Sequence, residues 1–235
     1  MPTIHSAVPK YPGSHSHNRQ TPDFDPLAKI YRWMEYCSFG PILERCRFHF
    51  LPQCSGARKA LILGDGDGRF TARLLASNHK VQVDAVDASA AMLTELRQRV
   101  QQAAPNAIKR LKTFHIDIRD FVPTGNDYDL VVSHFLLDCL TDTEVECLIE
   151  RILPHLDPNA EWIISEFSIS HRGWRRIYTG LVIHFLYFAF NKMTHLRVRH
   201  IPNYAQILCR FGFHRREQNH FLGGLLVAEV WKREK

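Results

Sequence analysis

A run of glycines and aspartates follows the first strongly apolar segment of the chain. Residues 60–63 (Ala-Leu-Ile-Leu) have the character of a buried strand. The loop after them consists of Gly64, Asp65, Gly66, Asp67 and Gly68. Glycines let a backbone turn sharply and approach a ligand without a Cβ in the way, although a tight structural turn could use them too. The spacing differs from the G-x-G-x-x-G of pyrophosphate-binding loops, and the two carboxylates favour a cationic ligand such as an ammonium or a sulfonium.

Two further aspartates follow the next two predicted strands. Asp87 comes 19 residues after Gly68, at the end of a strand, where a carboxylate can accept both hydroxyls of a ribose. It could instead cap the following helix, but Ser89 is better placed for that role, so we predict the ribose contact. Asp117 could accept an adenine amino group, although aspartate is also common in turns.

Candidates for proton transfer follow the fourth predicted strand. His134 has an ordinary pKa of about 6.5, which suits a general base, but it could equally line a ligand site without moving a proton. Asp138 could orient His134 or cap the helix that follows. Glu166, at the end of the fifth strand, is a weaker candidate and could have only a structural role.

The elements that position these residues alternate between strands and helices. Strands are predicted at 60–63, 81–86, 111–116, 128–133 and 162–167, and helices at 69–77, 89–102 and 142–153. This alternation predicts right-handed βαβ crossovers and a doubly wound α/β fold, with helices on both faces of a mostly parallel sheet. Helices are also predicted over 24–50, with a break at residues 39–41, and at 204–210. A hairpin of 213–218 with 225–231 follows.

The flanks of this core have different compositions. Residues 1–23 are rich in Pro, Ser, His and Gly and are predicted to be flexible. His15 and His17 could bind a metal there, but a solvated tail is the expectation, and we predict no metal site. The rest, 24–235, is expected to be a single domain: a helical cap at 24–52, the ligand-binding core at 58–167, and a basic and apolar insert at 171–200.

The charge of the chain is concentrated in one segment. The whole chain has a net charge of +6, from 30 Lys+Arg and 24 Asp+Glu. Residues 171–220 hold nine of these cations against Glu217 alone, a net +8, so the other 185 residues sum to −2. The basic average therefore describes the segment that includes the insert, and it is not by itself an indication of nucleic-acid or membrane binding.

The compartment is predicted from cysteines and apolar runs. The six cysteines have no CxxC or framework spacing, which favours reduced thiols. The N-terminal residues lack the apolar run of a signal peptide. The longest uncharged run, 177–191, has 15 residues, fewer than the roughly 20 of a membrane-spanning helix. We therefore expect a cytoplasmic protein.

Together these motifs resemble the class I S-adenosylmethionine-dependent methyltransferases over about residues 58–167. The family's glycine loop corresponds to 63–68, its D-x-S-x-x-M-L stretch to 87–93, its acidic residue after the third strand to Asp117, and its fourth strand to 128–133. One departure matters, because the acidic residue usually found two before the first glycine is Ile62 here. Asp65 or Asp67 could have taken over the methionine ammonium.

The resemblance implies a Rossmann-like, seven-stranded sheet with an antiparallel last strand, and S-adenosylmethionine as cofactor. The cofactor-binding residues that it implies are Gly64, Asp65, Gly66, Asp67, Gly68, Asp87, Ala88, Met92, Asp117, Ile118, Ser133, His134 and, closing over the cofactor, Tyr31. The reaction implied is a direct displacement at the sulfonium methyl, in which alignment is the main catalytic effect. A base is needed only for a protonated nucleophile, and His134 and Asp138 are the candidates.

The acceptor is predicted to be a small, apolar or aromatic molecule. The D/N-P-P-Y/F stretch of amino-methylating nucleic-acid enzymes is absent after the fourth strand, and so is a Pro-Cys pair. An RNA acceptor remains the alternative because of the +8 segment, and a binding module without transfer activity remains another because of Ile62. The oligomeric state is not predicted.

The C-terminal third carries a looser resemblance to the ubiquinone- and menaquinone-biosynthesis methyltransferases. It rests on residues 166–168, the insert, 211–213 and the glycine pair 223–224. In that family the insert and the N-terminal helices cover the substrate. The apolar run 181–190 is expected to pack in the core, with a substrate lid and a membrane-surface contact as alternatives.

Overall fold

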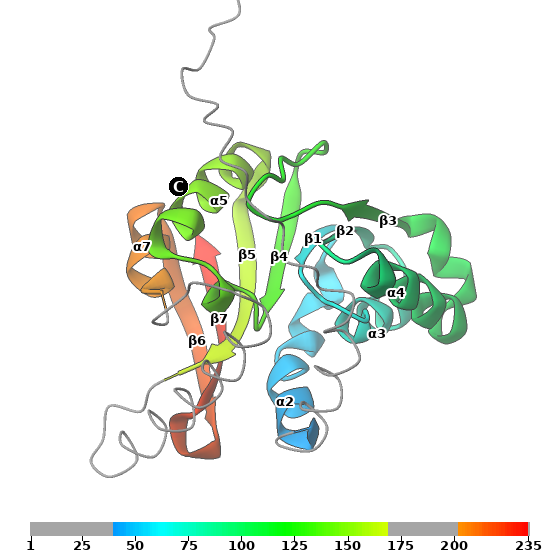
Figure 1. Cartoon of the computed structure of the whole chain (residues 1–235), viewed down its shortest axis with the longest axis horizontal. Coiled ribbons are helices and arrows are strands. Elements are labelled where there is room, and N and C mark those ends of the chain that lie inside the picture. Colours follow the sequence, from blue (N-terminus) through cyan, green and yellow to red (C-terminus); the bar gives the residue numbers. More distant parts are fainter. Residues whose placement is uncertain (1–39, 169–201, 235) are drawn as a thin grey trace, which may run out of the picture.

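A seven-stranded mixed sheet forms the centre of the protein. The computed structural model describes residues 40–168 and 202–234. The strands are β1 Lys59–Leu63, β2 Gln82–Asp87, β3 Leu111–His115, β4 Tyr128–His134, β5 Leu156–Phe167, β6 Phe213–Phe221 and β7 Leu226–Arg233. Their order is β3-β2-β1-β4-β5-β7-β6 (Figure 1). Strands β1 to β5 pair in parallel, whereas β7 is antiparallel to both of its neighbours, which confirms the predicted sheet.

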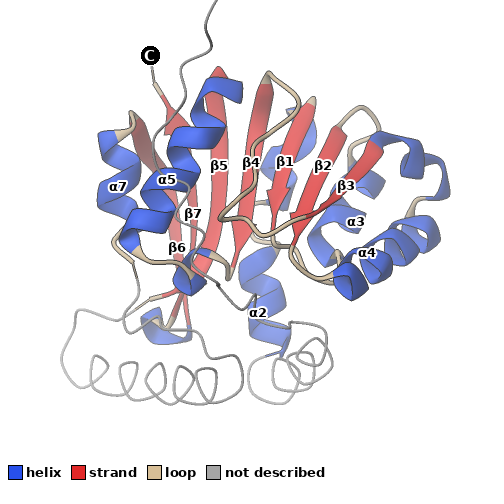
Figure 2. Ribbon diagram, turned by 45° about the horizontal axis from the view of Figure 1, so that its top comes forward, coloured by secondary structure: helices blue, strands red, loops and turns tan. Residues whose placement is uncertain are grey.

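Helices cover both faces of the sheet (Figure 2). They are α2 Gly40–Arg47, α3 Arg69–Ser77, α4 Ala90–Ala103, α5 Asp142–Ile152 and α7 Tyr204–Arg210. Alternate residues of a strand point to opposite faces. In β1, Ala60 and Ile62 pack in the core that contains residues of α2, α3 and α4, while Leu61 and Leu63 pack in the core that contains residues of α5 and α7. The predicted doubly wound architecture is therefore present.

Local sequence signals explain where the helices begin. The Ser89 hydroxyl accepts a hydrogen bond from the Met92 N–H, so Ser89 caps α4 as predicted. Thr141 and Glu144 form a capping box at the start of α5. Asp138 is therefore not the cap of this helix.

The start of β5 and the end of α2 are among the element boundaries that differ from the predictions. Strand β5 begins at Leu156, six residues before the predicted start at Trp162. Its first half contains polar, solvent-facing residues and pairs with β4 through a register shift, so it lacks the apolar run that marks a buried strand. The predicted helix through Phe50 ends at Arg47 and gives way to a 3₁₀ turn, Leu51–Gly56.

Several predictions lie outside the described residues. These are the flexible segment 1–23, the part of the cap before residue 40, including Tyr31, and the insert 171–200. Within 40–168 and 202–234, no helix has the length and apolar character needed to cross a membrane.

Candidate active site at the carboxyl edge of the sheet

The glycine loop lies where β1 ends, at the edge that we call the carboxyl edge because β1 to β5 end there. Gly64, Gly66 and Gly68 all have left-handed backbones, with φ of 63°, 61° and 78°. A Cβ on Gly68 would lie 2.7 Å from the Cα of Leu96, so this glycine lets α3 pack against α4. A Cβ on Gly66 would meet only the Met92 sulfur, at 3.8 Å. Gly66 is thus the glycine whose backbone is open to a ligand.

Asp87 joins the loop to the next helix. Its Oδ2 accepts a hydrogen bond from the Gly66 N–H at 3.2 Å, and its Oδ1 accepts one from the Ser89 N–H at 2.9 Å. Burial raises the pKa of Asp87, and these backbone bonds act against that rise. Because each carboxylate oxygen has two acceptor positions, both oxygens can accept a further hydrogen bond, as a ribose diol requires.

The two aspartates of the loop have structural partners. The Asp65 carboxylate is buried at the start of α3, where it accepts hydrogen bonds from the Thr71 N–H at 2.8 Å and the Phe70 N–H at 3.4 Å. Burial raises its pKa to about 6. Asp67 pairs with Arg69 at 3.1 Å and Arg99 at 2.7 Å. The Arg47 guanidinium lowers the pKa of Asp65, against the larger effect of burial.

The other predicted cofactor contacts surround the end of β2. Ala88 and Met92 are half-buried beside Gly66 and Asp87. Ile118 is buried in the core on the α5 face. Asp117 forms an ion pair with Arg119 at 3.2 Å, and Arg119 also pairs with Glu144 at 2.8 Å. An adenine amino group would share the Asp117 carboxylate with Arg119.

His134 ends β4 on the face covered by α2 and α3. Its ring is 4% exposed and meets the Phe70 ring edge-on, with centroids 4.7 Å apart. Neither ring nitrogen has a hydrogen-bond partner among the described residues. Burial lowers the pKa of His134 well below its usual value, and the Arg47 guanidinium lowers it further. The imidazole is therefore neutral and has one donor and one acceptor unused.

Ser133, Asp138 and Glu166 lie on the opposite face of the sheet. The fully buried Ser133 hydroxyl accepts a hydrogen bond from the Trp162 indole N–H at 3.0 Å. Burial raises the pKa of Asp138 to about 6, and it raises the pKa of Glu166, which the nearby Asp138 carboxyl raises further. The structure does not bring Asp138 to His134, because successive strand residues alternate faces and the chain turns away after β4. The predicted orienting contact between them is absent.

Arg47 is a site residue that the sequence did not indicate. It ends α2, is buried, and places its guanidinium 5.8 Å from the centre of the Phe135 ring. Its positive charge lowers the pKa of both Asp65 and His134. A cation in the last turn of a helix is a common surface feature, so only the tertiary structure distinguishes this one.

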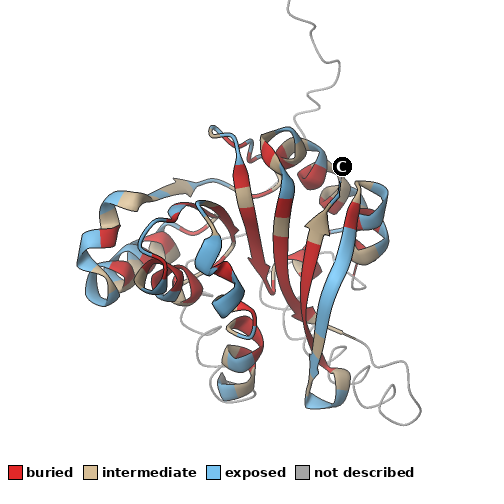
Figure 3. Ribbon diagram, turned by 180° about the vertical axis from the view of Figure 1, so that it is seen from behind, coloured by how far each residue is buried: buried red, intermediate tan, exposed pale blue. Residues whose placement is uncertain are grey.

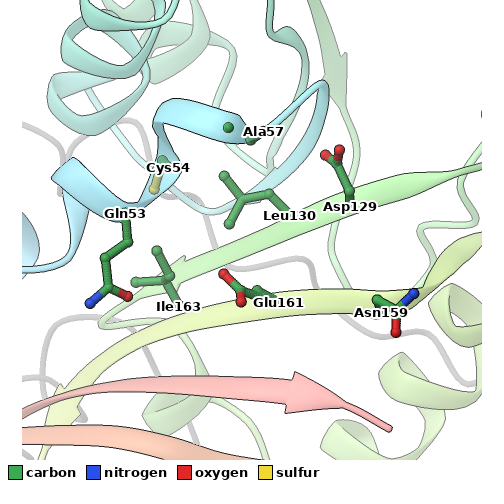
Figure 4. Close-up of a pocket in the computed structure, with 9 residues that line it drawn as sticks. Gln53, Cys54, Ala57, Asp129, Leu130, Asn159, Glu161 and Ile163 are labelled. Carbon is green, nitrogen blue, oxygen red and sulfur yellow. The ribbon is translucent and has the colours of Figure 1, made fainter. Parts of the chain in front are cut away.

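A pocket of about 180 Å³ opens at the opposite edge, where the parallel strands begin (Figure 4). We call this the amino edge. The pocket is lined by Gln53, Cys54, Gly56, Ala57, Asp129, Leu130, Asn159, Glu161 and Ile163. Its acids have protein partners: Asp129 accepts hydrogen bonds from the Arg58 and Lys59 N–H groups, and Glu161 lies 3.8 Å from Lys232. None of the predicted site residues lines it.

The fold, the glycine loop and the position of Asp87 are similar to those of known methyltransferases. Residues 61–161 match the family model described as a methyltransferase domain. The matched range contains the glycine loop and ends inside β5.

Curated relatives match part of the chain. The chain is 24% identical over 155 residues to the alpha N-terminal protein methyltransferase 1 of Arabidopsis thaliana, covering 66% of this chain and 50% of that protein. It is 31% identical over 124 residues to phosphoethanolamine N-methyltransferase 1 of Triticum aestivum, covering 52% and 24%. The chain thus spans half or less of the length of these relatives.

Solved structures share the fold. The mitomycin 7-O-methyltransferase MmcR superposes with a TM-score of 0.67 at 16% identity, covering 89% of this chain and 58% of the other. The N-methyltransferase NodS from Bradyrhizobium japonicum, in complex with S-adenosylhomocysteine, gives a TM-score of 0.57 at 16% identity, covering 83% and 89%.

Proposed function

We propose that this protein transfers a methyl group from S-adenosylmethionine to a small, apolar or aromatic acceptor. The observation that carries the proposal is the position of Asp87, whose carboxylate is fixed by the Gly66 and Ser89 N–H groups at the carboxyl edge. Two carboxylate oxygens held in this way can accept hydrogen bonds from the two hydroxyls of a ribose.

The residues around Asp87 fit the rest of the cofactor. The open backbone at Gly66 allows close approach, and the buried Asp65 carboxylate provides negative charge near a cationic amino-acid moiety. The half-buried Ala88 and Met92 offer an apolar wall for a base. When bound, the cofactor supplies an electrophilic methyl group on a sulfonium, a good leaving group.

His134 is suited to orienting a group more than to removing a strongly held proton. Its depressed pKa makes the neutral imidazole a weak base. One ring nitrogen can donate and the other can accept, so the ring can fix a polar group of the acceptor or cofactor. Catalysis would then come mainly from alignment of the nucleophile with the methyl group.

Similarity supports a small acceptor in part, and the acceptor class is open to test. MmcR is described as a mitomycin 7-O-methyltransferase and one curated relative as a phosphoethanolamine N-methyltransferase, whereas another relative is named for a protein acceptor. The apolar or aromatic character of the acceptor rests on the sequence alone. Methyl-labelled S-adenosylmethionine added to a cell extract, followed by separation of small molecules, RNA and protein, distinguishes the alternatives. We expect label in the small-molecule fraction. Label found only in RNA or protein would contradict this acceptor class.

The reduced thiols of Cys46 and Cys54, which form no disulfide, fit a location in the cytoplasm.

Cofactor binding is tested by calorimetric titration with S-adenosylhomocysteine. Asp87→Ala should weaken binding about 30-fold, because two carboxylate hydrogen bonds are lost. Asp84→Asn is the matched control, since Asp84 is on the same strand but accepts a hydrogen bond from the Tyr128 hydroxyl at 2.5 Å in the interior. We expect its affinity to equal the wild-type value. Absence of binding at millimolar ligand would contradict the proposed function.

A further inference from the structure

A buried glutamate at the end of β5 holds the turn that follows β4. Glu166 is 0% exposed, and its Oε1 accepts hydrogen bonds from the Leu136 N–H at 3.1 Å and the Leu137 N–H at 2.7 Å. This turn begins at Phe135, whose φ of 54° is in the left-handed region. The two amides have left the β ladder, so the carboxyl group provides the acceptor that buried backbone donors need.

The same turn is in contact with the glycine loop. A Cβ built on Gly64 would lie 2.8 Å from Cδ1 of Leu136, so the Leu136 side chain packs directly against the Gly64 backbone. Gly64 in turn donates its N–H to the Val86 carbonyl at 2.8 Å, which fixes the loop to β2. A continuous path of contacts therefore leads from Glu166 through Leu136 to the loop at the cofactor site.

The electrostatics of Glu166 favour a fixed, uncharged group. Burial raises its pKa well above the usual range, and the nearby Asp138 carboxyl raises it further. Its Oε2 is buried and has no hydrogen-bond partner among the described residues. A neutral side chain that accepts through Oε1 explains the geometry, and a glutamine can reproduce that acceptor.

We propose that Glu166 is a positioning residue, which holds the turn 135–137 against the glycine loop and thereby sets the affinity for the cofactor. The sequence suggested Glu166 only as a weak candidate for a base. Its oxygens instead contact the backbone of the turn, on the sheet face opposite His134. The inference rests on the proposed function, because cofactor affinity is one of its two measured consequences.

Two substitutions of similar side-chain volume separate the loss of the hydrogen-bond acceptor from a change in side-chain shape. Glu166→Gln keeps a carbonyl oxygen at Oε1, and Glu166→Met removes it. We expect Glu166→Gln to bind S-adenosylhomocysteine within about twofold of wild type, and Glu166→Met to bind about tenfold more weakly, since about one net hydrogen-bond contribution is lost. Amide hydrogen exchange in the ligand-free protein should become about tenfold faster at Leu136 and Leu137 in Glu166→Met only.

The matched control is Glu229→Met on β7. Glu229 is also buried, and its carboxylate accepts hydrogen bonds from Arg215 and Gln218 of β6 and from Trp231 of β7, none of which belongs to the turn 135–137. We expect this variant to unfold more easily and to keep its affinity for S-adenosylhomocysteine.

Several results would overturn the inference. They are wild-type affinity in a folded Glu166→Met, equal losses in Glu166→Met and Glu166→Gln, or an equal loss in Glu229→Met. If Glu166→Met does not fold, Leu136→Ala tests the same path, because it removes the contact with Gly64 and leaves Glu166 in place. It should weaken binding several-fold, and unchanged affinity would refute the inference. Failure of wild type to bind contradicts the proposed function, while hydrogen exchange still reports whether Glu166 holds the turn.

Discussion

The two edges of the sheet differ in how their buried polar groups are satisfied. At the amino edge, the Asn78 amide donates to the carbonyls of Cys54, Ser55 and Ala57, and its Oδ1 accepts from the N–H groups of Lys80 and Val81. At the carboxyl edge, both nitrogens of His134 and one oxygen of Glu166 have no hydrogen-bond partner among the described residues.

This difference separates stability from function. Buried polar groups in native proteins are nearly always hydrogen-bonded, so groups that lack a partner are expected where a ligand or another segment supplies it. The amino edge has an open pocket but polar groups that are already partnered, whereas the carboxyl edge combines unpartnered groups with an open glycine backbone. Judged by its pocket alone, the amino edge would be taken for the ligand site, although its polar groups already have partners.

The largest effect is expected from Asn78→Ala at the amino edge. Asn78 is 5% exposed, and the substitution leaves several buried backbone groups without partners. We expect a loss of about 3–5 kcal/mol in the free energy of unfolding. Affinity for S-adenosylhomocysteine should not change in the folded fraction. Urea unfolding and calorimetry check this, and a small loss of stability would weaken the contrast between the edges.

A smaller, pH-dependent effect is expected from Asp65→Asn at the carboxyl edge. The carboxyl group has a pKa of about 6 in the folded protein and about 3.8 when unfolded. Between these values unfolding releases a proton, so wild-type stability falls as the pH rises, and the loss is complete above about pH 6. The stability of Asp65→Asn relative to wild type should therefore increase by about 2.4 kcal/mol from pH 4 to pH 7. Urea unfolding at both pH values measures it, and a constant difference would disprove it.

The smallest effect on stability is expected from His134→Leu. The imidazole has no hydrogen bond to lose within the described residues, so the free energy of unfolding should change by no more than about 1 kcal/mol. Methyl transfer to the acceptor, once identified, should fall clearly because the orienting group is gone. A destabilisation as large as that of Asn78→Ala would mean that His134 is structural.

Much of the fold followed from the sequence because β1, β2 and β4 are short, mostly apolar and mostly buried. The glycine loop, Asp87 and the Ser89 cap were predicted from local spacing, and the last antiparallel strand came from the family resemblance. The start of β5 was missed because residues 157–161 are mostly polar and solvent-facing. Local patterns do not contain the register shift that brings Leu156 opposite Tyr128.

The site was predicted less completely, since its contacts join distant segments. The two arginines that pair with Asp67 come from α3 and α4, and Arg99 is 32 residues away along the chain. Ser133 precedes His134 but faces the other side of the sheet, where Trp162 binds its hydroxyl. The burial of Arg47 is likewise a tertiary property, so no motif marks it.

The strand order has a consequence for synthesis. Strand β7 lies between β5 and β6, although it follows β6 in the chain, so β6 has no place in the sheet until β7 has been made. A growing chain therefore carries β6 as an unpaired strand for a time. Most residues of β6 are polar or charged and solvent-exposed, among them His214, Arg216 and Glu217 (Figure 3). Such side chains protect a waiting strand from pairing with other nascent chains on the ribosome.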